Sequence, residues 1–107
     1  MDALARLLAL RGGVRDGALL RISIASALVE EARWDEAIVE LKRALNFDPN
    51  YSAAWKLLGK AFTQIGDTTG AIAAFHAGID AATARGDKQA AKEMQVFLRR
   101  LEKSPDS

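Results

Sequence analysis

Few residues of this sequence have the type and spacing that catalysis requires. His76 is the only histidine, and it follows Phe75 in an alanine-rich stretch, where a surface residue is more common than a general base or a metal ligand. The serines lack the Gly-x-Ser-x-Gly context of an activated nucleophile, and cysteine is absent. We therefore expect no enzyme activity, no cofactor and no metal site.

Basic residues offer a binding chemistry instead. Lys56 and Lys60 are four residues apart, and residues 88–103 contain five basic and two acidic residues. The lysine spacing places two ammonium groups on one face of a helix, where they repel each other by roughly a few tenths of a kcal/mol and attract a carboxylate. The alternative is that these side chains only keep the surface soluble.

The chain has the length and composition of one small helical domain. It contains 107 residues, half of them apolar, with two prolines and a net charge of +1. Such a charge gives no general attraction to nucleic acid or membranes. Residues 1–10 are rich in leucine and alanine, but Arg6 interrupts them and Gly12-Gly13 follows, so we expect a short helix and not a targeting segment. A cytoplasmic location is the expectation.

Two helices joined by a turn must position the lysine pair. Trp55, Leu58 and Phe62 recur at i, i+3 and i+7, which predicts an apolar stripe along a first helix. Gly59 lies between them, where the missing side chain lets a second helix approach closely. We therefore expect the lysines to face away from this stripe.

Glycine and aspartate mark the end of one helix and the start of the next. Glycine is favoured just after a helix and aspartate is a preferred N-cap, so Gly66-Asp67 predicts one turn and Gly86-Asp87 predicts another. Ala71 and Phe75 lie one turn apart on the second helix. A small and a large side chain at this spacing are typical of antiparallel helices that interdigitate.

The same pattern occurs once more, about 34 residues earlier. The matching positions are Ile24 with Leu58, Ala25 with Gly59, Leu28 with Phe62, Ala37 with Ala71, Ile38 with Ile72, Leu41 with Phe75 and Leu45 with Ile79. One position departs from the pattern, since Arg21 stands where the other copy has Trp55. The first copy is therefore expected to be degenerate on its first helix and well formed on its second.

These signals describe a single domain over residues 1–103. The expected parts are an N-terminal helix (1–11), a first repeat (17–50), a second repeat (51–85), a final helix (87–103) and a disordered tail (104–107). The N-terminal helix either packs on the first repeat or, because it is short and precedes Gly12-Gly13, stays mobile or swaps onto another copy. The final helix is amphipathic, as expected of a helix that covers the open end of a repeat stack.

The second copy resembles the signature of the tetratricopeptide repeat (TPR) family. The resemblance rests on Trp55-x-x-Leu58-Gly59-x-x-Phe62, on Gly66-Asp67 and on Ala71-x-x-x-Phe75, and it extends from about Gly17 to Leu101. It implies an all-α, right-handed solenoid of antiparallel helix-turn-helix repeats, with an extra helix at each end. It also implies a non-enzymatic adaptor whose first helices line a concave groove for an extended peptide or a partner helix.

Partner contacts in such a groove are expected from both copies and from the final helix. They are Ile22, Ser26, Lys56, Lys60 and Thr63, with Lys92 and Arg99 as an extension. The lysine pair resembles part of the carboxylate clamp of chaperone-binding TPR domains. The rest of that clamp is missing, because Ile22, Ser26 and Leu57 stand where it needs one lysine and two asparagines. A groove apolar at Ile22 and Val29 and basic at its other end suits an acidic amphipathic segment.

Two other functions stay open. The first is homo-oligomerisation through the N-terminal helix or an uncovered repeat face, which would make stability depend on protein concentration. The chain would then be a weak homodimer in place of a monomer. The second is RNA binding through the basic final helix, which would depend strongly on salt. It ranks last, because aromatic residues for base stacking are few and the net charge is small.

Overall fold

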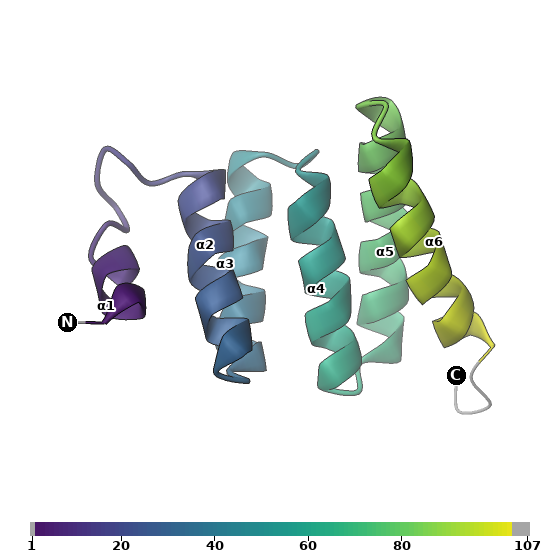
Figure 1. Ribbon diagram of the computed structural model, residues 1–107, viewed down its shortest axis with the longest axis horizontal. Coiled ribbons are helices and arrows are strands. Elements are labelled where there is room, and N and C mark those ends of the chain that lie inside the picture. The colour runs from purple at the N-terminus through teal and green to yellow at the C-terminus, as the bar shows by residue number, and fades with distance from the viewer. Residues whose placement is uncertain (1, 104–107) are drawn as a thin grey trace.

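Six helices make up most of the chain that the computed structural model describes, which is residues 2–103 (Figure 1). They are α1 (Ala3–Leu8), α2 (Ala18–Glu30), α3 (Trp34–Phe47), α4 (Ser52–Gln64), α5 (Thr68–Ala84) and α6 (Lys88–Glu102). The predicted tail at 104–107 lies outside the described residues. The predicted N-terminal helix over 1–11 is shorter in the structure, because residues 9–15 form turns and a bend before α2.

The helices form two layers along the longest axis of the molecule. Figure 1 shows α2, α4 and α6 in the nearer layer, with α3 and α5 behind them. Consecutive helices pack against each other, and α4 also contacts α6. The overall extents are 43 × 30 × 19 Å, as expected of a short stack. The prediction of an all-α antiparallel array of helix-turn-helix repeats is confirmed.

An apolar core runs between the two layers from α1 to α6. Ile24 and Leu41 are fully buried in the part of the core that extends from α1 to α5. Phe75 and Met94 are fully buried in the part between α5 and α6, and Phe62 packs against both parts. Because each repeat buries its apolar face on the next, the helices stabilise one another as a stack.

Two glycines allow close contacts between α5 and its neighbours. A Cβ added at Gly59 would lie 2.6 Å from the Phe75 ring, which confirms that the absent side chain lets α5 approach α4. A Cβ at Gly78 would lie 2.4 Å from Met94 Sδ and 2.8 Å from Trp55 Cβ. Gly78 was not predicted from the sequence, and it brings α5 close to both α4 and α6.

The two predicted Gly-Asp turns are present, and both aspartates cap the helices that follow. The Oδ1 atom of Asp67 accepts a hydrogen bond from the Gly70 N–H at 2.8 Å, and Oδ1 of Asp87 accepts one from the Ala90 N–H at 3.1 Å. Each bond satisfies an N–H group that has no partner within its own helix. These caps start α5 and α6 at the residues where the chain must reverse direction.

The corresponding turn of the first repeat carries backbone strain. Gly66 and Gly86 adopt left-handed φ angles of +80° and +75°, and Ala32, one repeat length before Gly66, adopts +56°. Glycine takes this conformation readily, whereas a Cβ makes it unfavourable by about 1–2 kcal/mol. Ala32 is the only described non-glycine residue with a positive φ.

Replacing Ala32 with glycine is therefore expected to raise the free energy of unfolding by about 1 kcal/mol, since the relief of strain exceeds the added entropy of the unfolded chain. Urea denaturation would measure the change. Gly66→Ala is the matched control, because a Cβ there meets no atom within 4 Å and only strains the backbone. It should lower the free energy by a similar amount. An Ala32→Gly variant no more stable than the original chain would contradict the assignment of strain.

A partly buried ion network occupies the position where the second repeat has Trp55. Arg21 Nη1 donates to Glu40 Oε2 at 2.8 Å, and Arg11 Nη1 donates to Glu40 Oε1 at 2.6 Å. Arg21 also donates to both carboxylate oxygens of Asp16, at 2.9 and 2.8 Å. Glu40 is 4% exposed and is the one buried charged residue in the described part of the chain. The first repeat therefore replaces an aromatic contact with paired charges.

This network holds the segment between α1 and α2. Hydrogen bonds from Arg21, and then from the Gly12 N–H at 2.8 Å, lower the pKa of Asp16 below its ordinary value. The hydrogen bond to Asp16 likewise raises the pKa of Arg21. Leu4 is buried where α1 packs on α2. In this structure α1 packs on α2 of the same chain.

Candidate protein-binding surface

A pocket between α2 and α4 brings together four of the residues predicted to contact a partner. Its volume is about 210 Å³, and it is lined by Ile22, Ser26, Ala53, Lys56, Leu57 and Lys60. Equivalent positions of the two repeats meet here, because Lys56 and Lys60 follow Ile22 and Ser26 by one repeat length. The pocket therefore has an apolar and hydroxyl wall on α2 and a basic wall on α4.

The Lys56 ammonium already has a carboxylate partner on α6. Its Nζ atom donates to Oε2 of Glu93, and this bond is the main cause of a lowered pKa at Glu93. Both side chains are partly exposed, at 30% for Lys56 and 40% for Glu93. The basic end of the pocket is thus partly neutralised by the chain itself, and Lys56 is in a position where it binds a carboxylate.

Lys60 lies against an aromatic pair. Its Nζ atom is 5.4 Å from the centroid of the Phe97 ring, within the range of a cation–π contact. Phe97 in turn stacks on the buried Phe75, with ring centroids 5.5 Å apart and an angle of 8° between the planes. The position of the Lys60 ammonium therefore depends on the packing between α5 and α6.

The other three predicted residues lie away from this pocket. Thr63 is exposed, and its Oγ1 atom donates to the Gly59 carbonyl at 2.8 Å within α4. Lys92 lines a separate hollow of about 270 Å³ at the turn between α5 and α6. Arg99 is exposed one residue after the buried Leu98. The structure therefore does not join Lys92 and Arg99 to the lysine pair.

Glu93 and Phe97 were not predicted from the sequence. They lie one turn apart on α6, on the side that meets Lys56 and Lys60, whereas the prediction used the basic side of the same helix. Glu93 and Phe97 have the same i, i+4 spacing as Lys56 and Lys60. Once α4 and α6 are known to be neighbours, this shared spacing indicates that Glu93 pairs with Lys56 and Phe97 with Lys60. From the sequence alone, the basic face of α6 carried more charged residues, so the prediction used that face.

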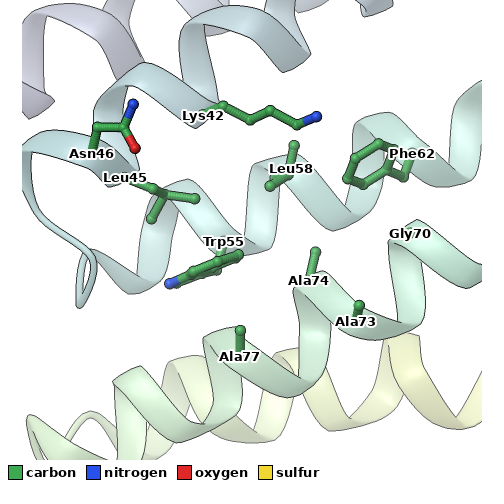
Figure 2. A pocket seen from close by; sticks show the side chains of 10 residues that line it. All are labelled: Lys42, Leu45, Asn46, Trp55, Leu58, Phe62, Gly70, Ala73, Ala74 and Ala77. Atoms are coloured by element: carbon green, nitrogen blue, oxygen red, sulfur yellow. The ribbon is translucent and has the colours of Figure 1, made fainter.

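A larger groove lies on the opposite side of α4, between α3 and α5 (Figure 2). Its volume is about 650 Å³. Trp55, Leu58 and Phe62 of α4 form the floor, and the wall on α5 consists of small residues: Gly70, Ala73, Ala74 and Ala77. Across the groove, Lys42 of α3 places its Nζ atom 5.7 Å from the centroid of the Phe62 ring. An open, mainly apolar groove therefore lies over the second repeat.

Nothing in residues 2–103 assembles a metal site or a membrane-spanning helix. No group of three or more histidine, cysteine, aspartate or glutamate side chains in this range is placed to hold a metal ion. None of its helices has both the length and the hydropathy needed to cross a membrane. His76 is exposed on α5, beside the buried Phe75.

The fold and its surfaces define an all-helical repeat domain with exposed grooves on both sides of α4. The family model described as TPR repeat matches residues 25–66. The chain is 45% identical over 89 residues to the TPR repeat-containing protein PA0015 of Pseudomonas aeruginosa, covering 83% of this chain and 85% of that protein. The chain belongs to the TPR family. Proteins of this family generally act as non-enzymatic scaffolds for protein–protein interaction.

Solved structures resemble the chain over nearly its whole length. The solution structure of protein BPP2914 from Bordetella parapertussis has a TM-score of 0.82 at 44% identity, covering 95% of this chain and 89% of that one. The crystal structure of PcrH from Pseudomonas aeruginosa has a TM-score of 0.87 at 18% identity, covering 94% and 77%. At that identity the second likeness shows the fold alone.

Proposed function

We propose that this chain is a non-enzymatic adaptor that binds a peptide or helix of another protein in the pocket between α2 and α4. The observation that carries the proposal is the convergence of Ile22, Ser26, Lys56 and Lys60 on one pocket of the α2, α4 and α6 layer. A side chain of the partner would enter between the apolar α2 wall and the basic α4 wall. The backbone of the partner would then run along this layer.

An acidic side chain is the contact that this pocket favours in a partner. Lys56 already binds the Glu93 carboxylate, so its ammonium is positioned for such a group. An ammonium has three donors, and a second carboxylate is therefore able to bind without displacing Glu93. Lys60 adds positive charge one turn away, next to Phe97, which offers apolar contact. Exposed pairs of this kind contribute about 0–1 kcal/mol each, so we expect modest affinity.

The test is a pull-down from native lysate with the chain and its Lys56→Glu, Lys60→Glu variant, followed by titration of the recovered partner. We expect the double charge reversal to weaken partner binding by about tenfold or more, a loss of about 1.4 kcal/mol or more, because two attractive contacts become repulsive. Circular dichroism should show an unchanged helical fold.

A matched control separates this pocket from net charge. Arg15→Glu with Lys103→Glu makes the same change in charge at two exposed residues outside the pocket. Binding that survives the control but not the pocket variant supports the proposal. Equal loss in both would indicate general electrostatic attraction, and unchanged binding in both would show that the pocket is not the site. Recovery of only further copies of the chain would favour the homo-oligomerisation alternative.

A further inference from the structure

The groove between α3 and α5 has a counterpart one repeat earlier in the chain. A smaller pocket of about 210 Å³ lies between α1 and α3, over α2. Six residues that line this pocket lie 34 positions before residues that line the groove. The equivalent pairs are Leu8 and Lys42, Arg11 and Leu45, Leu28 and Phe62, Glu36 and Gly70, Val39 and Ala73, and Glu40 and Ala74. The two spaces are therefore equivalent parts of the same architecture.

Charged side chains of the chain itself fill the first of these spaces. Glu40 lies there between Arg11 and Arg21, with hydrogen bonds of 2.6 and 2.8 Å, and no buried side-chain N or O atom of the described residues lacks a partner. Arg21 takes the place of Trp55, and Glu40 takes the place of Ala74. The first space is thus narrower, and its buried polar groups are satisfied.

The second space has no such filling. Alanine and glycine replace the longer side chains on the α5 wall, so the groove is about three times larger, at about 650 Å³ against about 210 Å³. Its floor exposes the partly buried Trp55 and Phe62, whose rings would gain from contact with apolar groups. Lys42 is the one charged residue in its lining. A ligand that complements this groove has bulky apolar side chains and a carboxylate.

We propose that the groove between α3 and α5 is a second binding site, which takes an amphipathic helix with large apolar side chains and an acidic residue facing Lys42. Shape supports a helix, because a wall of small residues lets a helix backbone approach closely. Charge supports the acidic residue, because Lys42 borders the apolar floor and no lining residue is acidic. This site is on the opposite side of α4 from the pocket of the proposed adaptor function, so the chain would bind two partners at once.

The test begins with a displayed library of amphipathic helical peptides, selected on the full chain. The apolar stripe is randomised among large apolar residues, and one flanking position is glutamate, glutamine or lysine. We expect enrichment of glutamate at that position. An enriched peptide would then be titrated against the Trp34→Phe variant, in which Trp55 on the groove floor is the single fluorescent tryptophan. Binding should change its emission.

Two filling variants locate the bound peptide. Ala73→Leu fills the groove at an exposed position of α5 and should weaken peptide binding by about tenfold. Ala53→Leu makes the same change at an exposed position in the pocket between α2 and α4 and should leave binding unchanged. Lys42→Glu should reverse the preference, so that the lysine form of the peptide binds more tightly than the glutamate form.

Four results would overturn the proposal. These are no enrichment, enrichment that ignores the charged position, weakening by Ala53→Leu in place of Ala73→Leu, and self-association that Ala73→Leu abolishes in sedimentation. The third would place the peptide in the adaptor pocket, and the fourth would make a second copy the occupant. Loss of the adaptor partner in Lys56→Glu, Lys60→Glu is a separate result, so the two proposals succeed or fail independently.

Discussion

Replacing Glu40 with alanine is expected to lower the free energy of unfolding by about 1.5–3 kcal/mol, because it removes the charge-assisted hydrogen bonds from Arg11 and Arg21. The change leaves Arg21, whose side chain is 14% exposed, without the carboxylate that faces it across α2 and α3. Arg21 keeps its hydrogen bonds to Asp16, but its guanidinium, which is largely removed from water, loses one of its two carboxylate partners, and Arg11 loses its carboxylate partner as well. A domain of this size is stable by only about 5–15 kcal/mol, so the loss would be a large fraction of the total.

Urea denaturation followed by circular dichroism would measure this effect. The sharpest control is the double variant Arg21→Trp, Glu40→Ala, which gives the first repeat the pair that the second repeat has at Trp55 and Ala74. Well-packed apolar residues replace a buried ion pair with little loss and sometimes with a gain. We expect the double variant to recover most of the stability lost in Glu40→Ala. A double variant as unstable as the sum of its single changes would contradict this equivalence.

Phe75→Ala should lower the free energy of unfolding by about 3–5 kcal/mol. Phe75 is 1% exposed and fills the space above Gly59, where its ring also stacks on Phe97. Its removal leaves a cavity between α4, α5 and α6 that rigid helices only partly close. Because Phe97 supports Lys60, the variant should also disturb the basic wall of the pocket.

Thermal and urea unfolding of Phe75→Ala would be compared with Phe47→Ala. Phe47 ends α3 and is 54% exposed, so its replacement removes the same side chain with little buried contact. We expect the control to lose less than about 1 kcal/mol, since surface substitutions away from special features have small effects. Similar losses in the two variants would mean that the stacked aromatic pair is not central to the stability of the fold.

The last helix has a larger role than covering the end of the stack. Met94 and Leu98 bury the open face of α5, as the amphipathic pattern predicts. The adjacent face carries Glu93 and Phe97, which contact the two lysines of α4. Figure 1 shows α6 in the same layer as α2 and α4, so it completes the layer that contains the pocket of the proposed adaptor function. Changes on α6 should therefore affect binding and stability separately, depending on the face they alter.

The helices, the turns and their order were predictable from local features of the sequence. Apolar spacing, Gly-Asp pairs and a period of about 34 residues are local signals, and each acts through the backbone of one segment. Gly59 was also predictable, because its place within an apolar stripe indicates which helix it faces. The convergence of Ile22 and Ser26 with Lys56 and Lys60 follows from the same period, since equivalent residues of adjacent repeats lie next to each other.

The side chains that fill the spaces between helices could not be identified before the helices were placed in three dimensions. In the sequence, Arg21 departs from the repeat pattern, which has Trp55 at the equivalent position. Its pairing with Glu40 depends on the distance between α2 and α3. Glu93 reaches Lys56 from 37 positions along the chain, on a face that the charge pattern alone did not favour. The open groove over Trp55 depends on the volumes of side chains from three helices at once. The spacing of apolar residues in the sequence predicts which face of each helix is buried. The packing of these faces against each other then determines which side chains touch and where cavities remain.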